Sequence, residues 1–155
     1  MMRSHRCGEL NATHTGQQVT LCGWVHSRRD HGGVTFIDLR DTSGLVQVVF
    51  SVDSSEATHA AAQELRGEYC IRVMGDVRAR KEGTTNPNLP TGEIEIAATE
   101  LEVFTMAETP PFQVDEHRTT DEMLRLQYRY IDLRRPSMQD NLKLRHQIIS
   151  SIRRF

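Results

Sequence analysis

Hydrophobic and polar residues alternate with a period of two through several short segments of the first two thirds of the chain. In residues 18–30, Val19, Leu21, Gly23 and Val25 fall on one face, and this alternation is typical of a β-strand. Gly23, in the middle of the segment, indicates a bend of the kind that the long first strand of a small closed barrel needs.

Two more strands follow at short intervals. Residues 34–40 and 45–51 are predicted as the second and third strands, separated by turn signals at 31–33 and 41–44. Three strands joined by two tight turns predict an antiparallel meander.

A helix then interrupts the strands. Residues 52–67 are rich in alanine, begin with Ser54 or Ser55 as an N-cap and end at Gly67. Residues 69–80 and 93–105 are predicted as the fourth and fifth strands. The loop between them contains two prolines and two glycines. The order of three strands, a helix and two strands predicts a mainly β fold, the five-stranded OB-fold barrel with a helix between strands three and four.

The last third of the chain has another pattern. Residues 106–118 contain Pro110 and Pro111 and are predicted to form an extended linker. Thr119 with Glu122 predicts a capping box for a short helix. A last helix is predicted to begin near Pro136, and its apolar residues form a stripe along one face. The sequence stops inside this helix. We therefore expect a truncated chain.

Composition and charge narrow the class of protein. The 155 residues are 37% hydrophobic and 26% charged, which is typical of a globular protein, and the net charge of −2 argues against coating nucleic acid by bulk electrostatics. No apolar run has the length of a membrane span and the N-terminus lacks the pattern of a signal peptide. We expect a cytoplasmic protein that does not bind membranes.

The sequence contains no pattern of catalytic or metal-ligating residues. Its three cysteines form no CxxC pair, its seven histidines show no HxxxH or HExxH spacing, and GxGxxG and GxxxxGK[ST] are absent. We expect a binding module with no catalytic residue, no metal and no cofactor of its own.

Candidate binding residues lie on the predicted second and third strands, where OB-folds bind single-stranded nucleic acid. Phe36 falls opposite the apolar face that carries Ile37, so its ring can stack on a base, a contact worth about 1–3 kcal/mol. The amide of Gln47 can pair with a base edge, and Arg29 can bind phosphate or a base. The alternatives are a core position for Phe36 and ordinary solvent-facing roles for Gln47 and Arg29.

Four segments together resemble a known family. GWVHSRRDHGGVTFIDLRD, GLVQVVF, GEIEI and YRYIDLRRP are similar to the N-terminal part of bacterial aspartyl-tRNA synthetases, which are class II aminoacyl-tRNA synthetases. The resemblance spans essentially the whole chain. It implies that residues 1–105 form an OB-fold anticodon-binding domain, that 106–135 form a hinge, and that 136–155 begin a truncated class II catalytic domain.

The resemblance also implies roles for individual residues. Phe36 would stack on the central U of the anticodon, Gln47 would hydrogen-bond to it, and Arg29 would lie between the first and central bases. The residues implied near the other bases are Glu95 at the first and Arg80 and Asn86 at the third. His31 and Gly83 resemble members of the family that charge the asparagine tRNA as well.

The complete parent protein would be an aspartate–tRNA ligase. The resemblance implies that it attaches aspartate to tRNA(Asp), and in some members to tRNA(Asn), with ATP and Mg²⁺, and that it is a homodimer. Two other functions stay open from the residues alone. The chain could be a free-standing OB-fold that binds single strands without preference, or a barrel with a structural or protein-binding role.

Overall fold

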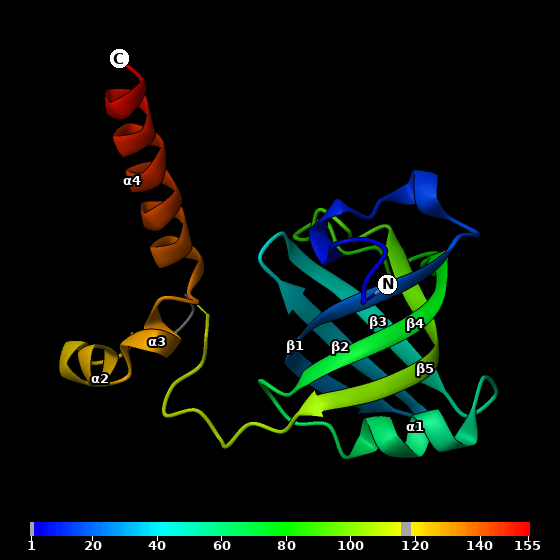
Figure 1. The fold of residues 1–155 in the computed structure, drawn as a ribbon. Coiled ribbons are helices and arrows are strands. Elements are labelled where there is room, and N and C mark those ends of the chain that lie inside the picture. Colours follow the sequence, from blue (N-terminus) through cyan, green and yellow to red (C-terminus); the bar gives the residue numbers. More distant parts are fainter. Residues whose placement is uncertain (1, 116–118) are drawn as a thin grey trace. The chain divides into compact units, whose positions relative to one another are not determined.

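The chain divides into two compact units, within Met1–Glu108 and Thr109–Phe155, in a computed structural model that describes residues 2–115 and 119–155 (Figure 1). The first unit carries the strands and the second carries the last three helices. Each unit has its own small hydrophobic core.

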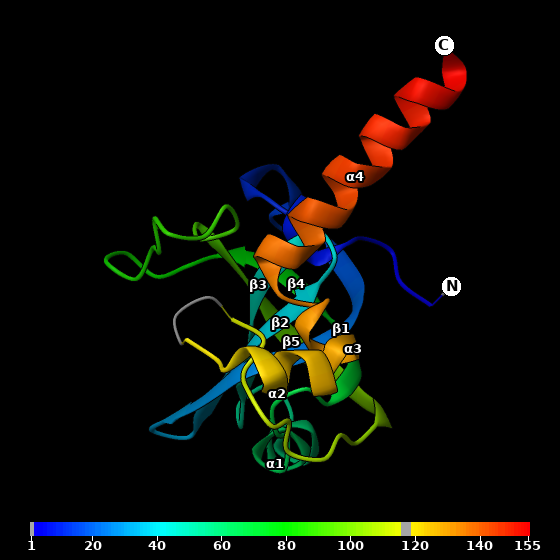
Figure 2. The same cartoon turned by 90° about the vertical axis from the view of Figure 1, so that its left-hand side faces the viewer.

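Five strands close into a barrel in the first unit, as the alternating pattern predicts. Around the barrel the order is β1-β2-β3-β5-β4, and every neighbouring pair is antiparallel except β3 and β5, which are parallel. The helix α1 connects β3 to β4, and the long β4–β5 connection extends beyond the ends of its strands (Figure 2). The bounds are β1 (Gln18–His31), β2 (Val34–Asp41), β3 (Gly44–Ser51), α1 (Glu56–Gln63), β4 (Cys70–Ala79) and β5 (Ile94–Thr105). The predicted mainly β, five-stranded OB-fold barrel is confirmed.

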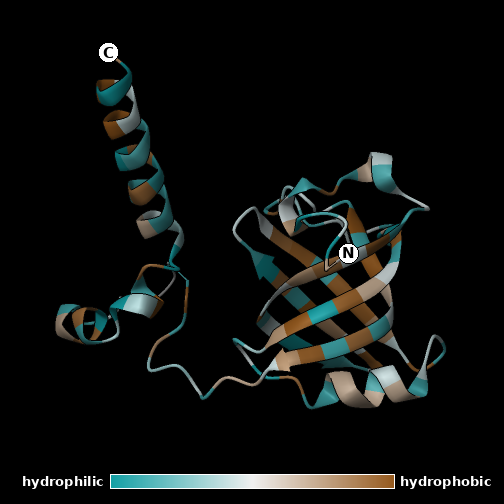
Figure 3. Cartoon of the chain, viewed as in Figure 1, coloured by the Kyte–Doolittle hydropathy of each residue, from teal (hydrophilic) through white to brown (hydrophobic). Residues whose placement is uncertain are grey.

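The barrel interior is filled by the inward side chains of all five strands. Leu21, Ile37, Val48, Ile71 and Ile96, one from each strand, are completely buried in one cluster. Hydrophobic and hydrophilic residues alternate along the strands in Figure 3 because successive side chains point to opposite faces. Burying each such side chain stabilises the fold by about 1.5–3 kcal/mol.

Two short 3-10 helices, η1 (Cys7–Glu9) and η2 (Ala12–His14), lie at one end of the barrel, and α1 lies at the other (Figure 1). Cys7 and Leu10 enter the core cluster. The backbone N–H of Cys7 donates to the Asp41 carboxylate at 2.9 Å. The N-terminal segment therefore closes the barrel where β2 turns into β3.

Two glycines allow strands to approach closely where the barrel bends. A Cβ added to Gly75 would lie 2.3 Å from the carbonyl oxygen of Ala97, and one added to Gly23 would lie 2.5 Å from that of Arg40. Both contacts are far shorter than a carbon–oxygen contact can be without displacing the backbone. The prediction of a bend at Gly23 agrees with this close approach.

The second unit contains α2 (Glu122–Gln127), α3 (Arg129–Asp132) and α4 (Pro136–Arg154). The N-cap of α2 is Asp121, whose Oδ1 accepts from the N–H of Leu124 at 3.2 Å, so the predicted cap at Thr119 was wrong. An aspartate two residues nearer to the helix supplies the same acceptor.

The predicted linker is partly packed. Residues 106–115 form no helix or strand, yet Phe112 and Val114 are buried against Ile131 in a small core of the second unit. Asp132 is also completely buried, and its carboxylate accepts from Arg125 and Arg129. Residues 116–118 of the predicted linker lie outside the described residues.

The helix α4 begins at Pro136, as predicted, and carries hydrophobic residues at intervals along its length (Figure 3). Leu142, Leu144, Ile148 and Ile152 are all exposed in the unit as described. Among the described residues, no helix combines the length and the hydropathy that a membrane crossing needs.

Candidate nucleic-acid interface

The β2–β3 hairpin determines which residues share the outer face of the barrel. Its turn pairs Asp41 with Gly44, which sets Asp38 opposite Gln47 and Phe36 opposite Val49. Phe36 is half-buried, while its neighbour Ile37 is completely buried in the core. The prediction that Phe36 points away from the core is therefore confirmed.

A β-bulge in β1 brings Arg29 to the same face. Val25 pairs with Leu39 and Ser27 pairs with Asp38, so His26 is an extra residue on β1. Without it, the alternation that buries Val25 would also turn Ser27 and Arg29 into the core. Bulges commonly re-aim side chains in this way beside binding sites.

The bulge separates the two arginines that end the strand. Arg29 pairs with Phe36 across β1 and β2 and its side chain reaches the outer face. Arg28 turns the other way and donates to the main-chain carbonyl groups of Gln63 and Leu65 at the end of α1. Arg28 therefore has a structural role, whereas Arg29 joins the candidate site.

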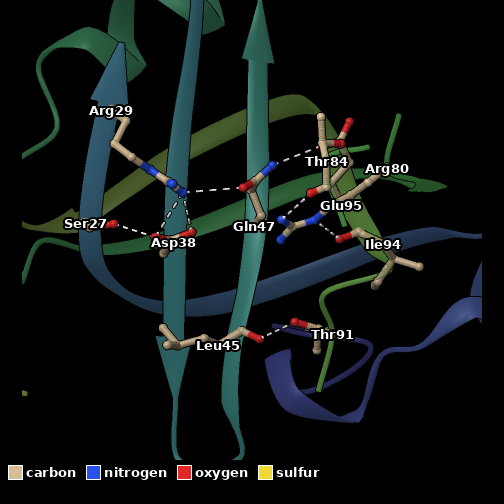
Figure 4. Close-up of polar contacts among 10 residues, drawn as sticks. All are labelled: Ser27, Arg29, Asp38, Leu45, Gln47, Arg80, Thr84, Thr91, Ile94 and Glu95. Atoms are coloured by element: carbon tan, nitrogen blue, oxygen red, sulfur yellow. Dashed lines mark hydrogen bonds and ion pairs between the residues drawn. The ribbon is translucent and has the colours of Figure 1, made fainter. Parts of the chain in front are cut away.

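Six polar side chains, from all five strands of the barrel, form a hydrogen-bonded row across the outer face, the polar row (Figure 4). Its members are Ser27 and Arg29 of β1, Asp38 of β2, Gln47 of β3, Arg78 of β4 and Glu95 of β5; Figure 4 draws all of them except Arg78. Asp38 of β2 links to both β1 members, because it accepts from Ser27 and from Arg29.

Distances within the polar row define how it is connected. Gln47 Nε2 donates to Glu95 Oε2 at 3.0 Å, and Gln47 Oε1 accepts from Arg29 Nη2 at 3.4 Å. Arg78 Nε donates to the other oxygen of Glu95 at 2.8 Å. Both functional atoms of the amide and both oxygens of the Glu95 carboxylate therefore have partners.

Burial differs sharply along the polar row. Gln47 and Glu95 are only 8% and 6% exposed, whereas the Arg29 side chain is 57% exposed. An amide and a carboxylate held in a fixed position are suited to pair with the edge of an unpaired base, and the exposed guanidinium beside them can contact base or phosphate. The aromatic ring of Phe36 lies on the strand between Arg29 and Val49.

Arg80, just past the end of β4, adds a further positively charged side chain beside the polar row. Its Nε donates to the carbonyl oxygen of Ile94 at 3.0 Å and its Nη1 to that of Thr84 at 3.5 Å (Figure 4). Its Nη2 is the one buried side-chain nitrogen or oxygen of the described chain without a hydrogen-bond partner. Burial lowers the pKa of Arg80, and the nearby Glu95 carboxylate works against that shift.

The β4–β5 connection carries two more of the predicted residues. Asn86 shapes the loop, because its Oδ1 accepts from the N–H of Asn88 at 3.0 Å and its backbone N–H donates to Gly92. Thr91 anchors the loop to the start of β3 through a 2.7 Å hydrogen bond to the carbonyl oxygen of Leu45. Gly83 has a φ of +80°, which suits a turn.

The structure therefore brings together four of the predicted site residues and leaves others apart. Arg29, Gln47 and Glu95 are linked in the polar row, with Phe36 beside Arg29. Arg80 lies at its edge (Figure 4), whereas Asn86 and Gly83 lie in the loop and His31 is exposed at the β1–β2 turn.

Sequence reasoning assigned no role to Ser27 or Asp38, both of which are members of the polar row. Ser27 Oγ donates to Asp38 Oδ2 at 2.5 Å. The signal for Asp38 is present in the sequence, because a turn at 41–44 places Asp38 opposite Gln47. The signal for Ser27 is hidden by the bulge.

Comparison with known families agrees with this architecture. Residues 19–104 match the family described as OB-fold nucleic acid binding domain, and this match spans more than half of the chain. The chain thus belongs to the family of OB-fold nucleic acid binding domains. Residues 121–155 match a second family, described as tRNA synthetases class II (D, K and N), so the barrel is joined to the beginning of a class II synthetase domain.

Solved structures show the same combination. The asparaginyl-tRNA synthetase from Pyrococcus horikoshii is 28% identical over 99% of this chain, with a TM-score of 0.83, and the chain covers 35% of that enzyme. An aspartyl-tRNA synthetase from Entamoeba histolytica is 20% identical over 94% of this chain, with a TM-score of 0.75 and 36% of its own length covered. At that identity the second likeness shows the fold alone. The chain thus spans well under half of either enzyme.

Proposed function

We propose that this chain binds the anticodon of tRNA(Asp) as the N-terminal part of an aspartate–tRNA ligase. One observation carries the proposal: an outward aromatic ring, Phe36, lies beside a buried amide and a buried carboxylate, Gln47 and Glu95, on the outer face of an OB barrel. Stacking and base-edge hydrogen bonding are the two means by which proteins select unpaired bases.

Each side chain has a part in this proposal. Phe36 stacks on the central U, and Gln47 hydrogen-bonds to its edge. Glu95 accepts from the amine of the first base, G, because a carboxylate on this face can only accept. Arg29 lies between the first and central bases. Gln47 and Glu95 exchange the hydrogen bond that they share, 3.0 Å long, for bonds to the bases.

The third base is proposed to lie near Arg80 and Asn86. The support is the buried Nη2 of Arg80, since proteins seldom leave a buried donor without an acceptor. His31, the last residue of β1, and Gly83, in the β4–β5 connection, are proposed to relax selectivity at the third base so that tRNA(Asn) is also a partner. The aspartate assignment rests on the RRDHGGVTFIDLRD run, which resembles the bacterial aspartate type.

Attachment of aspartate to tRNA is proposed for a longer protein, of which this chain is the N-terminal part. We propose that this protein is a cytoplasmic homodimer that joins aspartate to tRNA with ATP and Mg²⁺. Among the described residues, no three histidine, cysteine or acidic side chains form a cluster that could hold a metal ion.

Binding to anticodon stem-loops tests the proposal. The affinity of the 155-residue chain is measured by fluorescence anisotropy at one fixed salt concentration for three loops: GUC, GAC and GUU. Replacing the central U by A should weaken binding by about tenfold or more, because adenine can still stack but presents another edge to Gln47, and a buried polar group left unpaired costs about 1–3 kcal/mol. Replacing the third base should change the affinity little if the chain accepts both tRNAs.

The same titration separates the proposal from its alternatives. Equal affinities for GUC and GAC would indicate a single-strand binder without preference and would overturn anticodon recognition. No binding to any loop would favour a structural or protein-binding barrel.

A further inference from the structure

The head group of Arg29 is tethered at a single nitrogen. Its Nη2 lies 3.0 Å and 3.1 Å from the two carboxylate oxygens of Asp38 and 3.4 Å from Gln47 Oε1. Within the part of the chain that the structure describes, every hydrogen bond and ion pair of the Arg29 side chain uses Nη2. The donors on Nε and Nη1 take no part in these bonds.

Asp38 is itself fixed in place. Its side chain is 18% exposed, it lies opposite Gln47 in the β2–β3 ladder, and its Oδ2 accepts from Ser27 Oγ at 2.5 Å. It sits between a serine that orients it and an arginine that it orients (Figure 4). Both of its oxygens lie within hydrogen-bond distance of Arg29 Nη2, and a charged acceptor binds a guanidinium more strongly than a neutral one does.

The charge of Asp38 is unfavourable for affinity. A negative side chain on a surface that binds nucleic acid repels the phosphates, so bulk electrostatics alone predicts that its removal strengthens binding to any single strand. Its contacts indicate a different contribution. By holding Arg29 in one position, Asp38 reduces the freedom that this long side chain would lose when a base is bound.

We propose that Asp38 is a positioning residue, which fixes the Arg29 guanidinium over the outer face and increases discrimination between bases rather than affinity for RNA. This inference rests on the proposed function, because it assumes that unpaired bases bind beside Phe36 and Gln47. It adds Asp38, with Ser27 as its support, to the residues that determine specificity.

The test is the ratio of the affinities for the GUC and GAC stem-loops, measured with the wild-type chain and with Asp38→Asn. The ratio should fall toward one, by up to about tenfold, while affinity for the GAC loop stays equal or rises, because Asn keeps the shape but loses the charge. A purely electrostatic role would change both affinities by the same factor and leave the ratio unchanged, which would overturn the proposal.

Two further variants make the outcome unambiguous. Ser27→Ala keeps the charge of Asp38 and removes its hydrogen bond from Ser27, so it should lower the ratio by a smaller factor, and a ratio equal to the wild-type value would overturn the supporting role of Ser27. Glu102→Gln removes a carboxylate that pairs with Arg72 at 2.8 Å elsewhere on the barrel, and it should leave the ratio at the wild-type value.

The wild-type ratio separates this inference from the function on which it rests. A wild-type chain that binds both loops equally overturns the proposed function. A wild-type chain that discriminates, together with an Asp38→Asn variant that discriminates equally, overturns the positioning role alone. Melting curves followed by fluorescence of Trp24 establish that each variant is folded.

Discussion

Phe36 and its two neighbours on β2 differ in the face of the barrel to which they point. Thr35 and Ile37 are completely buried, whereas Phe36 lies half-buried on the opposite face. An aromatic ring there adds little to the core, but it offers a flat apolar surface to a base. The consequence is that binding and stability should respond separately to its removal.

We expect Phe36→Ala to weaken binding of the GUC stem-loop by about 1–3 kcal/mol, the usual contribution of one stacked base. The urea midpoint should change much less, because the ring is outside the core cluster. Phe104→Ala is a matched control, since Phe104 is an exposed aromatic residue on β5 outside the polar row. Equal losses of affinity in the two variants would remove the stacking role of Phe36.

At the scale of elements, the closure of the barrel depends on the contact between η1 and the β2–β3 turn. Asp41 joins them, because its carboxylate accepts from Cys7 N–H at 2.9 Å and from the N–H and hydroxyl of Ser43 at 2.7 and 2.6 Å. Burial raises the pKa of Asp41, but these hydrogen bonds, with a further one from the Gly44 N–H, outweigh burial and the net pKa is lowered.

The lowered pKa predicts how stability depends on pH. Asp41 binds its proton less readily in the folded chain than in the unfolded chain, so its stabilising contribution is complete above the unfolded pKa of about 3.9 and is lost as the pH falls through the folded value. Asp41→Asn should lower the free energy of unfolding by about 1–3 kcal/mol at pH 7. The difference from wild type should shrink on acidification below about pH 4.

Urea unfolding at pH 7 and pH 3 measures this effect, with fluorescence of Trp24, the single tryptophan, as a probe of the barrel. Asp76→Asn is the control, because Asp76 is an exposed carboxylate on β4 and makes no side-chain hydrogen bond or ion pair with other described residues. A loss for Asp41→Asn that is the same at both pH values would contradict the proposed linkage.

At the scale of the whole molecule, the chain combines two units with separate cores. The barrel core draws on residues between Cys7 and Val103, whereas the second core contains Phe112, Val114 and Ile131. Domains of about 100 residues bury enough apolar surface to fold alone. The polar row and Phe36 lie entirely within the first unit.

We therefore expect residues 1–108 to fold without the rest of the chain. The fragment should show one cooperative thermal transition by Trp24 fluorescence, with a midpoint close to that of the 155-residue chain. Its affinity for the GUC stem-loop should be within about twofold of the full value if the second unit makes no contact with this RNA. A fragment that is unfolded would show that the barrel depends on residues after Glu108.

The sequence alone determined the elements of the barrel and most of the candidate site. The period of two is a direct consequence of strand geometry, so it predicted five strands and the outward direction of Phe36. Turn chemistry fixed the β2–β3 register, and with it the place of Gln47. These features depend on interactions between residues that are close in the chain.

Tertiary structure decided what depends on neighbours far apart in the chain. The bulge at His26 sends Arg29 outward and Arg28 toward α1, and simple alternation could not predict it. Glu95 lies 48 residues after Gln47 in the sequence, and the two side chains make contact only because β5 pairs with β3. The polar row exists because barrel closure places these strands side by side, and the spacing of the residues along the chain does not encode their contacts.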